Sequence, residues 1–245
     1  MRANYTLPRL YLDAVLEAGG QVKLDKPQAH YIGTVLRKTA GDSLRVFNGH
    51  GGEWQCEIEV IDKKRALLRI SEQLRPAYTP PDIWLCFAPV RKRRNGFIFE
   101  KGTELGASRF QPVITARTQF PKMSLEKEKA RVIEAAEQTE RLDIPDVRAG
   151  VTLAELLSGW GKSRVLLFAD EGGAAAPAGE VLSNLSSHTP CALLTGPEGG
   201  FTSEERETLR GKDYVRPLSL GPRILRADTA ALSLLTLWQS ACGDW

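Results

Sequence analysis

The sequence of 245 residues has few cysteines and no long apolar run, and both absences exclude whole classes of protein. Its four cysteines lie far apart, with no CxxC pair and no nearby histidine, so they indicate neither a zinc site nor a disulfide framework. No apolar stretch approaches the roughly 18 residues that a membrane-spanning helix requires. The amino-terminal segment also lacks the apolar core of a secretory signal. We therefore expect a cytoplasmic protein with free thiols and no metal.

The chain also has little net charge, +3, but the excess is unevenly placed. Residues 1–75 hold twelve Lys and Arg against nine Asp and Glu, whereas residues 76–245 hold twenty-one of each. The whole basic surplus therefore belongs to the first third of the chain. A mild surplus is compatible with nucleic-acid binding, but it is more often an ordinary solvated surface.

A proline-rich segment separates two regions with different patterns. Residues 75–81 hold three prolines in seven positions, which is typical of a linker. Before it, alternating apolar and polar residues predict strands at 43–47, 53–61 and 65–71, preceded by a short helix within 27–37. We therefore predict a small, mostly β domain at residues 1–74.

After the linker the pattern changes to strands that alternate with helices, which is typical of a mainly parallel sheet with crossover helices. The predicted strands are 83–88, 110–114, 165–169, 191–195 and 215–218. The predicted helices are about 95–106, 124–141, 152–158, 203–210 and 228–241. Residues 82–245 are thus expected to form an α/β domain.

Two turns that contain Gly-Pro follow two of these strands. The first, TGPEGGFTSEE at 195–205, has three glycines at which backbone N–H groups can approach a ligand closely. It is neither a Walker loop nor GxGxxG, so a phosphate-cradling nucleotide hydrolase is disfavoured. The second, LGPRILRAD at 220–228, carries Arg223 and Arg226, which could hold a carboxylate or phosphate. Open α/β sheets bind ligands at the carboxyl ends of their strands, so the turns could form facing walls of one crevice. Tight turns without a ligand are the alternative.

These two elements resemble the signature of the bacterial small-subunit (16S) ribosomal RNA (uracil-N3)-methyltransferases, a branch of the SPOUT methyltransferases. The resemblance continues in HYIGTVLR at 30–37, KGTELG at 101–106 and EAAEQTER at 134–141, so it spans nearly the whole chain. Two departures are present. Asp228 stands where the family usually has glutamate. At residues 90–97, where relatives tend to have a Lys-Gly-Asp-Lys-like sequence, this chain has a different, arginine-rich one, and the sequence does not show what this loop does.

The resemblance implies a fold that periodicity would not predict, because chains generally avoid threading. It implies a SPOUT α/β trefoil-knot domain after a PUA-like β-barrel RNA-binding domain, and a homodimer to which the last helix, with Leu232, Leu235 and Trp238, contributes. It also implies that three knot loops bind S-adenosylmethionine, namely the end of the strand near Phe168 and Ala169, the turn at 195–200 and the segment 218–225. The residues that it assigns to the cofactor are Thr195, Gly196, Gly199, Gly200, Leu218, Leu220, Gly221, Ile224 and Leu225.

The implied reaction is methyl transfer from S-adenosylmethionine to N3 of a specific uridine in 16S ribosomal RNA of the small subunit. Uracil N3 carries a proton at neutral pH, so the reaction needs a base or a nearby cation. We expect Arg226 to steady the negative charge and Asp228 to orient it or act as base. Arg9, Arg37 and Lys38 of the basic domain are candidate phosphate contacts.

Two alternatives remain open. One is a SPOUT enzyme that acts on transfer RNA or on a ribose 2′-OH, and the other is a non-enzymatic RNA-binding dimer. The intact glycines of the first turn count against the second alternative. Whether the substrate is naked RNA or an assembled 30S subunit does not follow from the sequence.

Overall fold

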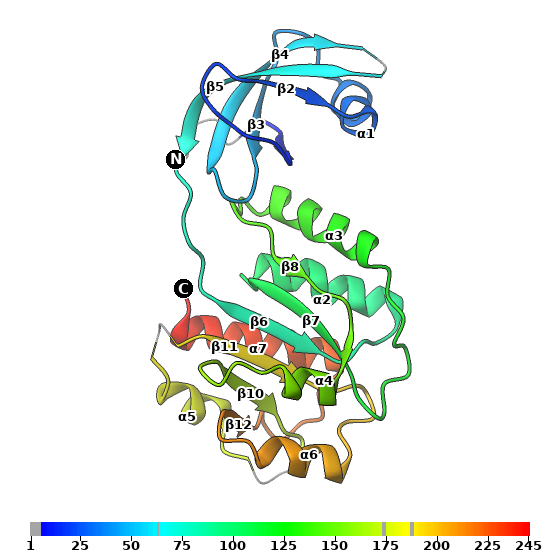
Figure 1. Ribbon diagram of the computed structural model, residues 1–245, viewed down its shortest axis with the longest axis vertical. Helices are drawn as coiled ribbons and strands as arrows, with labels where there is room; N and C mark the ends of the chain where they lie inside the picture. Colours follow the sequence, from blue (N-terminus) through cyan, green and yellow to red (C-terminus); the bar gives the residue numbers. More distant parts are fainter. Residues whose placement is uncertain (1–5, 63, 173–174, 187–188) are drawn as a thin grey trace. The chain divides into compact units, whose positions relative to one another are not determined.

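The computed structural model describes residues 6–62, 64–172, 175–186 and 189–245 (Figure 1). Its contacts divide the chain into two compact units. The first runs to Thr79 and also takes in Ala136–Ile144, and the second consists of Pro80–Ala135 and Pro145–Trp245. The change of unit after Thr79 falls within the proline-rich segment. The transfer of Ala136–Ile144 to the first unit is a finding that the sequence pattern did not predict.

The first unit contains a five-stranded sheet in the order β1-β3-β4-β5-β2. Neighbouring strands are antiparallel except for the parallel pair β1 and β3. The three longer strands were predicted, although β5 continues to Arg75 because Glu53 still pairs with that residue. The strands are β1 (Arg9–Tyr11), β2 (Gln21–Leu24), β3 (Ser43–Phe47), β4 (Glu53–Ile61) and β5 (Ala66–Arg75).

The helix predicted within 27–37 is present but changes its winding. Helix α1 (Lys26–His30) starts with a capping box, in which the Asp25 side chain accepts from the Gln28 N–H. The chain continues as a π-helical turn, η1 (Tyr31–Val35), that buries Ile32. The turn ends just before Arg37, whose φ of 55° stops further helix.

The second unit is built on a parallel sheet in the order β12-β10-β11-β6-β7-β8, with β9 pairing separately with β7. The five predicted strands are confirmed, whereas β8 and β9 have only two residues each and were not predicted. Because all neighbours are parallel, their carboxyl ends lie at one edge of the sheet. The strands are β6 (Ile83–Phe87), β7 (Arg109–Ile114), β8 (Asp146–Val147), β9 (Val151–Thr152), β10 (Val165–Ala169), β11 (Cys191–Thr195) and β12 (Val215–Leu218).

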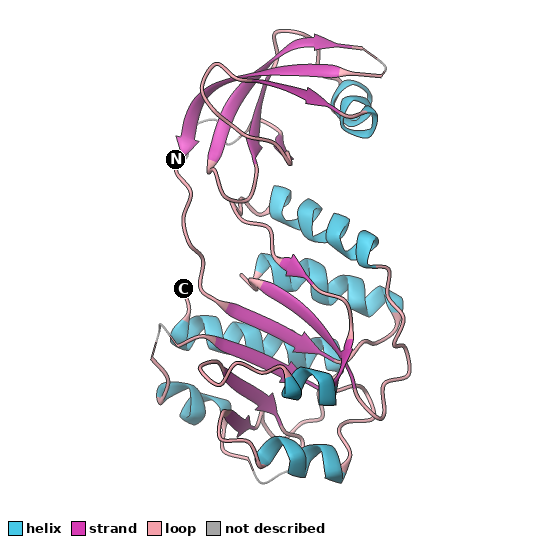
Figure 2. Cartoon of the chain, viewed as in Figure 1, coloured by secondary structure: helices cyan, strands magenta, loops and turns pink. Residues whose placement is uncertain are grey.

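Helices cover both faces of this sheet, as expected for an α/β domain (Figure 2). Helices α4 and α6 pack Leu153, Leu156 and Leu209 against Phe168 and Leu194 of the sheet. Helices α2 and α7 contact each other, and α7 also packs on β6 and β11. Among the described residues, none of the helices has the length and apolar character to cross a membrane. The helices are α2 (Lys92–Glu104), α3 (Leu125–Gln138), α4 (Leu153–Ser158), α5 (Ala178–Ser183), α6 (Ser203–Arg210) and α7 (Ala227–Cys242).

The path between β12 and α7 is the topological feature that builds the site. Strand β12 lies at an edge of the sheet, yet the next helix packs on β6 and β11, beyond the intervening β10. Residues 219–226 must therefore cross the carboxyl edge of the sheet. This crossing brings the second Gly-Pro turn next to the first.

Candidate functional site

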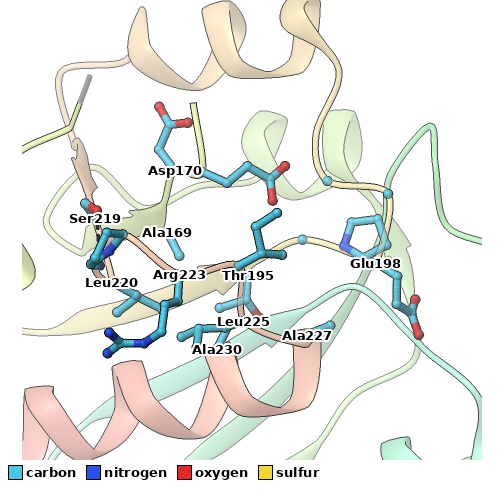
Figure 3. A pocket seen from close by; sticks show the side chains of 18 residues that line it. Ala169, Asp170, Thr195, Glu198, Ser219, Leu220, Arg223, Leu225, Ala227 and Ala230 are labelled. Carbon is cyan, nitrogen blue, oxygen red and sulfur yellow. Dashed lines mark hydrogen bonds between the residues drawn. The ribbon is translucent and has the colours of Figure 1, made fainter. Parts of the chain in front are cut away.

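Three loops at the carboxyl ends of β10, β11 and β12 surround a pocket of about 450 Å³ (Figure 3). The loops contribute residues 169–171, 195–200 and 219–225, and α7 adds Ala227 and Ala230. The volume suits a drug-sized ligand or cofactor, for which pockets of about 300–1,000 Å³ are usual. The sequence-based expectation that two Gly-Pro turns wall one crevice therefore agrees with the geometry.

The pocket brings together eight of the nine residues that were predicted to bind the cofactor. Leu218 is the ninth, and it is fully buried at the end of β12 outside the pocket lining. The loop after β10 adds Asp170 and Glu171, which were not predicted as site residues. The rule that ligands bind beyond the carboxyl ends of parallel strands could have identified them. The eight are Thr195, Gly196, Gly199, Gly200, Leu220, Gly221, Ile224 and Leu225.

Two glycines of the first turn are required by the loop's own packing. A Cβ on Gly196 would lie 2.8 Å from the ring of Phe201, which is buried edge to face against Phe168. Gly200 has a φ of +66°, and a Cβ there would lie 1.6 Å from the Glu171 carboxylate. That carboxylate accepts a hydrogen bond from the Phe201 N–H at 3.1 Å. These glycines therefore let the loop fold tightly over Phe201, with its backbone facing the pocket.

The other glycines of the site differ from these two. A Cβ on Gly199 would make only ordinary contact, at 3.5 Å, with Arg117, whose guanidinium donates to the Gly199 carbonyl at 2.8 Å. Gly221 in the second turn has open space around it but a φ of +103°, which L side chains rarely adopt. A side chain at position 199 would therefore meet no steric conflict within the chain, whereas the backbone conformation at position 221 favours glycine.

Thr195 is a residue of the pocket lining, and its hydroxyl is an unsatisfied polar group. Thr195 is 1% exposed, and its Oγ1 has no hydrogen-bond partner among the residues that the structure describes. A buried hydroxyl without a partner costs about 1–3 kcal/mol, so its persistence at a binding site points to a ligand that completes it. In Figure 3 the side chain lies in the middle of the site.

The remaining walls combine apolar surface with charged groups of both signs, since Arg223 lines the pocket together with the acidic residues. Leu220, Leu225 and Ala230 supply apolar area, and the carboxylates of Glu171 and Glu198 lie at the lining. Asp170 is committed to structure, because it accepts from Arg210 and from the Gly172 N–H. No group of three or more His, Cys, Asp or Glu in the described part of the chain could hold a metal ion. These features fit an uncharged ring system that carries charged groups.

The two residues predicted to be catalytic lie next to this pocket but do not line it. Arg226 is exposed at the position that precedes α7, between the lining residues Leu225 and Ala227. Asp228, in the first turn of α7, accepts a hydrogen bond from Arg94 of α2 at 3.4 Å. Their place agrees with a role at the mouth of the pocket, and their catalytic roles stay predictions.

The candidate phosphate contact Arg9 is corrected by the structure. Arg9 is only 7% exposed, and its Nε donates to Glu53 at 2.5 Å. Its other nitrogens donate to the backbone carbonyls of Ala136, Glu137 and Arg141. The guanidinium is therefore used inside the first unit, where it holds the segment Ala136–Ile144, and is not available to RNA. Arg37 is exposed and Lys38 half-buried, so these two remain candidates.

Arg9 belongs to a buried charge cluster of three arginines and two glutamates. Arg75 binds Glu53 at 2.8 Å and Glu140 at 3.1 Å, and Arg45 binds Glu140 at 2.8 Å. Burial alone would raise the pKa of Glu53, but hydrogen bonds and charge from Arg75 and Arg9 outweigh it and lower that pKa. Burial lowers the pKa of Arg9, although the negative charge of Glu53 acts in the opposite direction. An arginine nevertheless stays protonated in practice.

Of the three residues of the last helix that were predicted at a subunit interface, the structure buries two within the chain and leaves Leu232 half-buried. Leu235 and Trp238 are buried within the chain at 0% and 1% exposure, because α7 packs on α2, β6 and β11. They cannot also form an outward face. The large apolar side chains that do remain exposed near this region are Ile224 on the second turn, Leu237 on α7 and Trp245 after α7.

Comparison with protein families agrees with both units. A model described as the RNA methyltransferase domain matches residues 78–239, and a model described as the RNA methyltransferase PUA domain matches residues 24–71. The ribosomal RNA small subunit methyltransferase E of Rickettsia conorii is 33% identical over 93% of each chain. The protein of that name from Bacillus subtilis is 29% identical over 85% of this chain and 86% of its own length.

Solved structures give the same result. A methyltransferase of Legionella pneumophila in complex with the cofactor SAM is 31% identical, with a TM-score of 0.87 over 98% of this chain and 99% of its own. A ribosomal RNA small subunit methyltransferase E from Neisseria gonorrhoeae bound to S-adenosyl methionine is 27% identical, with a TM-score of 0.84 over the same shares. The motif resemblance and the SPOUT and PUA-like folds that it implied are confirmed. The chain belongs to the ribosomal RNA small subunit methyltransferase E family.

Proposed function

We propose that this chain transfers the methyl group of S-adenosylmethionine to N3 of a uridine in 16S ribosomal RNA, in the cytoplasm. The observation that carries the proposal is the pocket at the carboxyl edge of the sheet, with its glycine-rich turn and the partnerless Thr195 hydroxyl. Family membership supplies the reaction class, and the two related structures hold the cofactor.

The residues of the pocket suit S-adenosylmethionine. Bound there, the cofactor supplies an electrophilic methyl group on a cationic sulfur. The backbone of residues 195–200 and the Thr195 hydroxyl can bind its polar edges, while Leu220 and Leu225 can exclude water from its rings. Glu171 and Glu198 place negative charge at the lining and Arg223 places positive charge there, which suits a ligand that carries both a cationic sulfur and a carboxylate.

The chain must also deal with the proton on uracil N3. We assign Arg226 to stabilise the negative charge that develops on the ring, because it is exposed between two residues of the pocket wall. Asp228 is held by Arg94, so its carboxylate is oriented at the start of α7. It is the candidate to orient Arg226 or to accept the proton. N3 lies on the Watson–Crick edge, so the uridine must be unpaired when it reacts.

We assign binding of the surrounding RNA in part to the first unit. Arg37 is exposed directly after the π-helical turn, and Lys38 follows it. With Arg9 buried, these two are the phosphate contacts that remain from the sequence prediction. The substrate class that fits a PUA domain with a basic surplus is ribosomal RNA, either naked or within the 30S subunit.

We further propose that the enzyme is a homodimer. Ile224 is fully exposed although it lines the pocket, and Leu237 on α7 is 41% exposed. A branched apolar side chain at the mouth of a binding site is stabilised when a second surface covers it. A second copy of the chain would cover Ile224 and complete the site. Light scattering that gives one chain's mass at micromolar concentration would contradict this.

The substrate is tested by methyl transfer to defined RNAs. Radiolabelled S-adenosylmethionine is added to 30S subunits, to naked 16S ribosomal RNA and to transfer RNA, all from cells that lack the enzyme. We expect label in 16S ribosomal RNA and none in transfer RNA. Comparison of the first two substrates shows whether the assembled subunit is required. Label that enters transfer RNA instead would establish the alternative substrate.

A further inference from the structure

Two short runs of the second unit concentrate positive charge. Residues 91–94 are Arg, Lys, Arg and Arg, and Arg117 and Lys122 lie in residues 115–122, with no acidic residue in either run. Residues 76–245 hold twenty-one Lys and Arg against twenty-one Asp and Glu, so outside these two runs this part of the chain is acidic. The carboxylates that the structure places at these runs are Asp228, paired with Arg94, Glu128, paired with Arg131, and Glu205, which accepts a hydrogen bond from the Ala116 N–H at 2.8 Å. The remaining cations are not neutralised by these pairs.

Specific contacts connect both runs to the pocket. Arg117 donates to the carbonyl of Gly199, which lines the pocket. On the other side, Arg94 binds Asp228, which directly follows the lining residue Ala227. The guanidinium of Arg91 lies 5.8 Å from the ring centre of Phe120, so it links the two runs to each other. The two charged runs therefore contact residues that line the pocket, or residues next to them in the chain.

Exposed aromatic rings are interleaved with these cations. Phe97 on α2 is 44% exposed and Phe120 is 37% exposed, while Arg91, Lys92 and Arg93 are exposed beside them. Exposed phenylalanines are costly unless they have a partner. Cationic side chains for phosphates, together with aromatic faces for bases, form the usual platform for single-stranded nucleic acid. A free anion would instead need cations that converge on one point.

We infer that the start of α2 (residues 91–97) and the segment 115–122 form an RNA-contact surface of the second unit. It binds the single-stranded RNA that flanks the target nucleotide. Arg91 and Arg93 contact phosphates, and Phe97 and Phe120 stack on bases. This inference rests on the proposed function for its choice of RNA. It adds that the unit with the pocket holds its substrate by itself, beyond any contact from the first unit.

The test measures binding of a fluorescein-labelled 20-nucleotide oligouridylate to the full-length chain by anisotropy between 50 and 200 mM salt. The variant R91Q/R93Q removes two exposed cations of the surface. The matched control K162Q/K212Q also removes two exposed cations, but these precede β10 and β12 at the opposite edge of the sheet. Calorimetry with S-adenosylmethionine checks that each variant still folds and binds the cofactor.

We expect R91Q/R93Q to lower the salt slope of binding by about 1.4, because each lost contact with a single strand removes about 0.7. The control should keep the slope of the parent. Phe97→Ser should weaken binding about fivefold or more, since stacking on one base is worth about 1–3 kcal/mol. Equal slopes for R91Q/R93Q and the control would overturn the inference. A change of molecular mass in light scattering for Phe97→Ser would also overturn it, because the surface would then be covered by a second copy.

This measurement separates the inference from the function on which it rests. Binding of the oligonucleotide requires no methyl transfer, so it can succeed even if uridine N3 is not the target. The converse result is also possible. If the parent protein methylates 16S ribosomal RNA but R91Q/R93Q binds the oligonucleotide with an unchanged salt slope, the proposed function stands and the proposed RNA-contact surface is wrong.

Discussion

Gly196 and Gly199 lie three residues apart on one turn, but only the first is required by packing within the chain. A Cβ on Gly196 would meet the buried Phe201 ring at 2.8 Å, whereas one on Gly199 would touch Arg117 at an ordinary distance. We predict that Gly196→Ala lowers the free energy of unfolding by about 1–3 kcal/mol, the usual cost of overpacking. Gly199→Ala should change it by less than about 0.5 kcal/mol. Urea unfolding of both variants checks this, and equal losses would contradict it.

Thr195 tests whether the pocket is the cofactor site. Thr195→Val keeps the shape of the side chain but removes the partnerless hydroxyl, so the unliganded protein should be as stable or more stable. If the cofactor bonds to that hydroxyl, its affinity should fall about two- to tenfold, since one hydrogen bond contributes about 0.5–1.5 kcal/mol. Thermal unfolding and calorimetry measure the two effects. An unchanged affinity would remove Thr195 from the site.

At the residue scale, the sequence predicted the glycine turns directly, whereas it indicated the loop after β10 only through the family resemblance and without its acidic residues. Turn residues carry local signals, so residues 195–200 and 219–225 could be read directly. Asp170 and Glu171 join the pocket only because β10 lies beside β11 and β12, and that neighbourhood is a property of strand order. The burial of Arg9 was unpredictable for the same reason, since its partners are about 130 residues away.

At the scale of elements, the buried cluster around Glu53 makes the first unit sensitive to acid. The pKa of Glu53 is lowered in the folded chain, so its contribution to stability is present above its unfolded pKa of about 4.3 and is lost as the pH falls through the folded value. We predict that Glu53→Gln costs about 3–5 kcal/mol at pH 7, because three arginines lose a shared anion. The difference from the parent should shrink below about pH 4. Urea unfolding of both proteins from pH 7 to below pH 4 measures this difference in stability. A difference that stays constant with pH would contradict the prediction.

The elements that the sequence missed are those too short to show a period. Strands β1, β2, β8 and β9 have two to four residues, and each exists because a longer strand offers it backbone partners. Helix α3 was predicted at about 124–141 and is present at Leu125–Gln138, but its last residues, from Ala136, belong to the first unit. Periodicity identifies a buried face without identifying what covers it.

At the scale of the whole molecule, the first unit is discontinuous, and this has a consequence for its folding. Residues 1–79 alone lack the carbonyls that hold Arg9 and the carboxylate of Glu140 that holds Arg45 and Arg75. We predict that a fragment of residues 1–79 is unfolded or far less stable than the same fragment joined by a flexible linker to residues 136–144. Circular dichroism during urea unfolding compares the two. Equal stability would show that the segment is dispensable.

The central claim is that the pocket at the carboxyl edge of the sheet serves methylation of a uracil ring nitrogen in 16S ribosomal RNA. Mass spectrometry of nucleosides from 16S ribosomal RNA tests it most directly, after incubation with S-adenosylmethionine and either the parent chain or the Thr195→Val and Arg226→Ala variants. The account predicts 3-methyluridine with the parent, less with Thr195→Val at low cofactor concentration, and a loss of turnover with Arg226→Ala that exceeds its loss of cofactor affinity. A 2′-O-methylated nucleoside, or no methylated uridine with the parent, would contradict it.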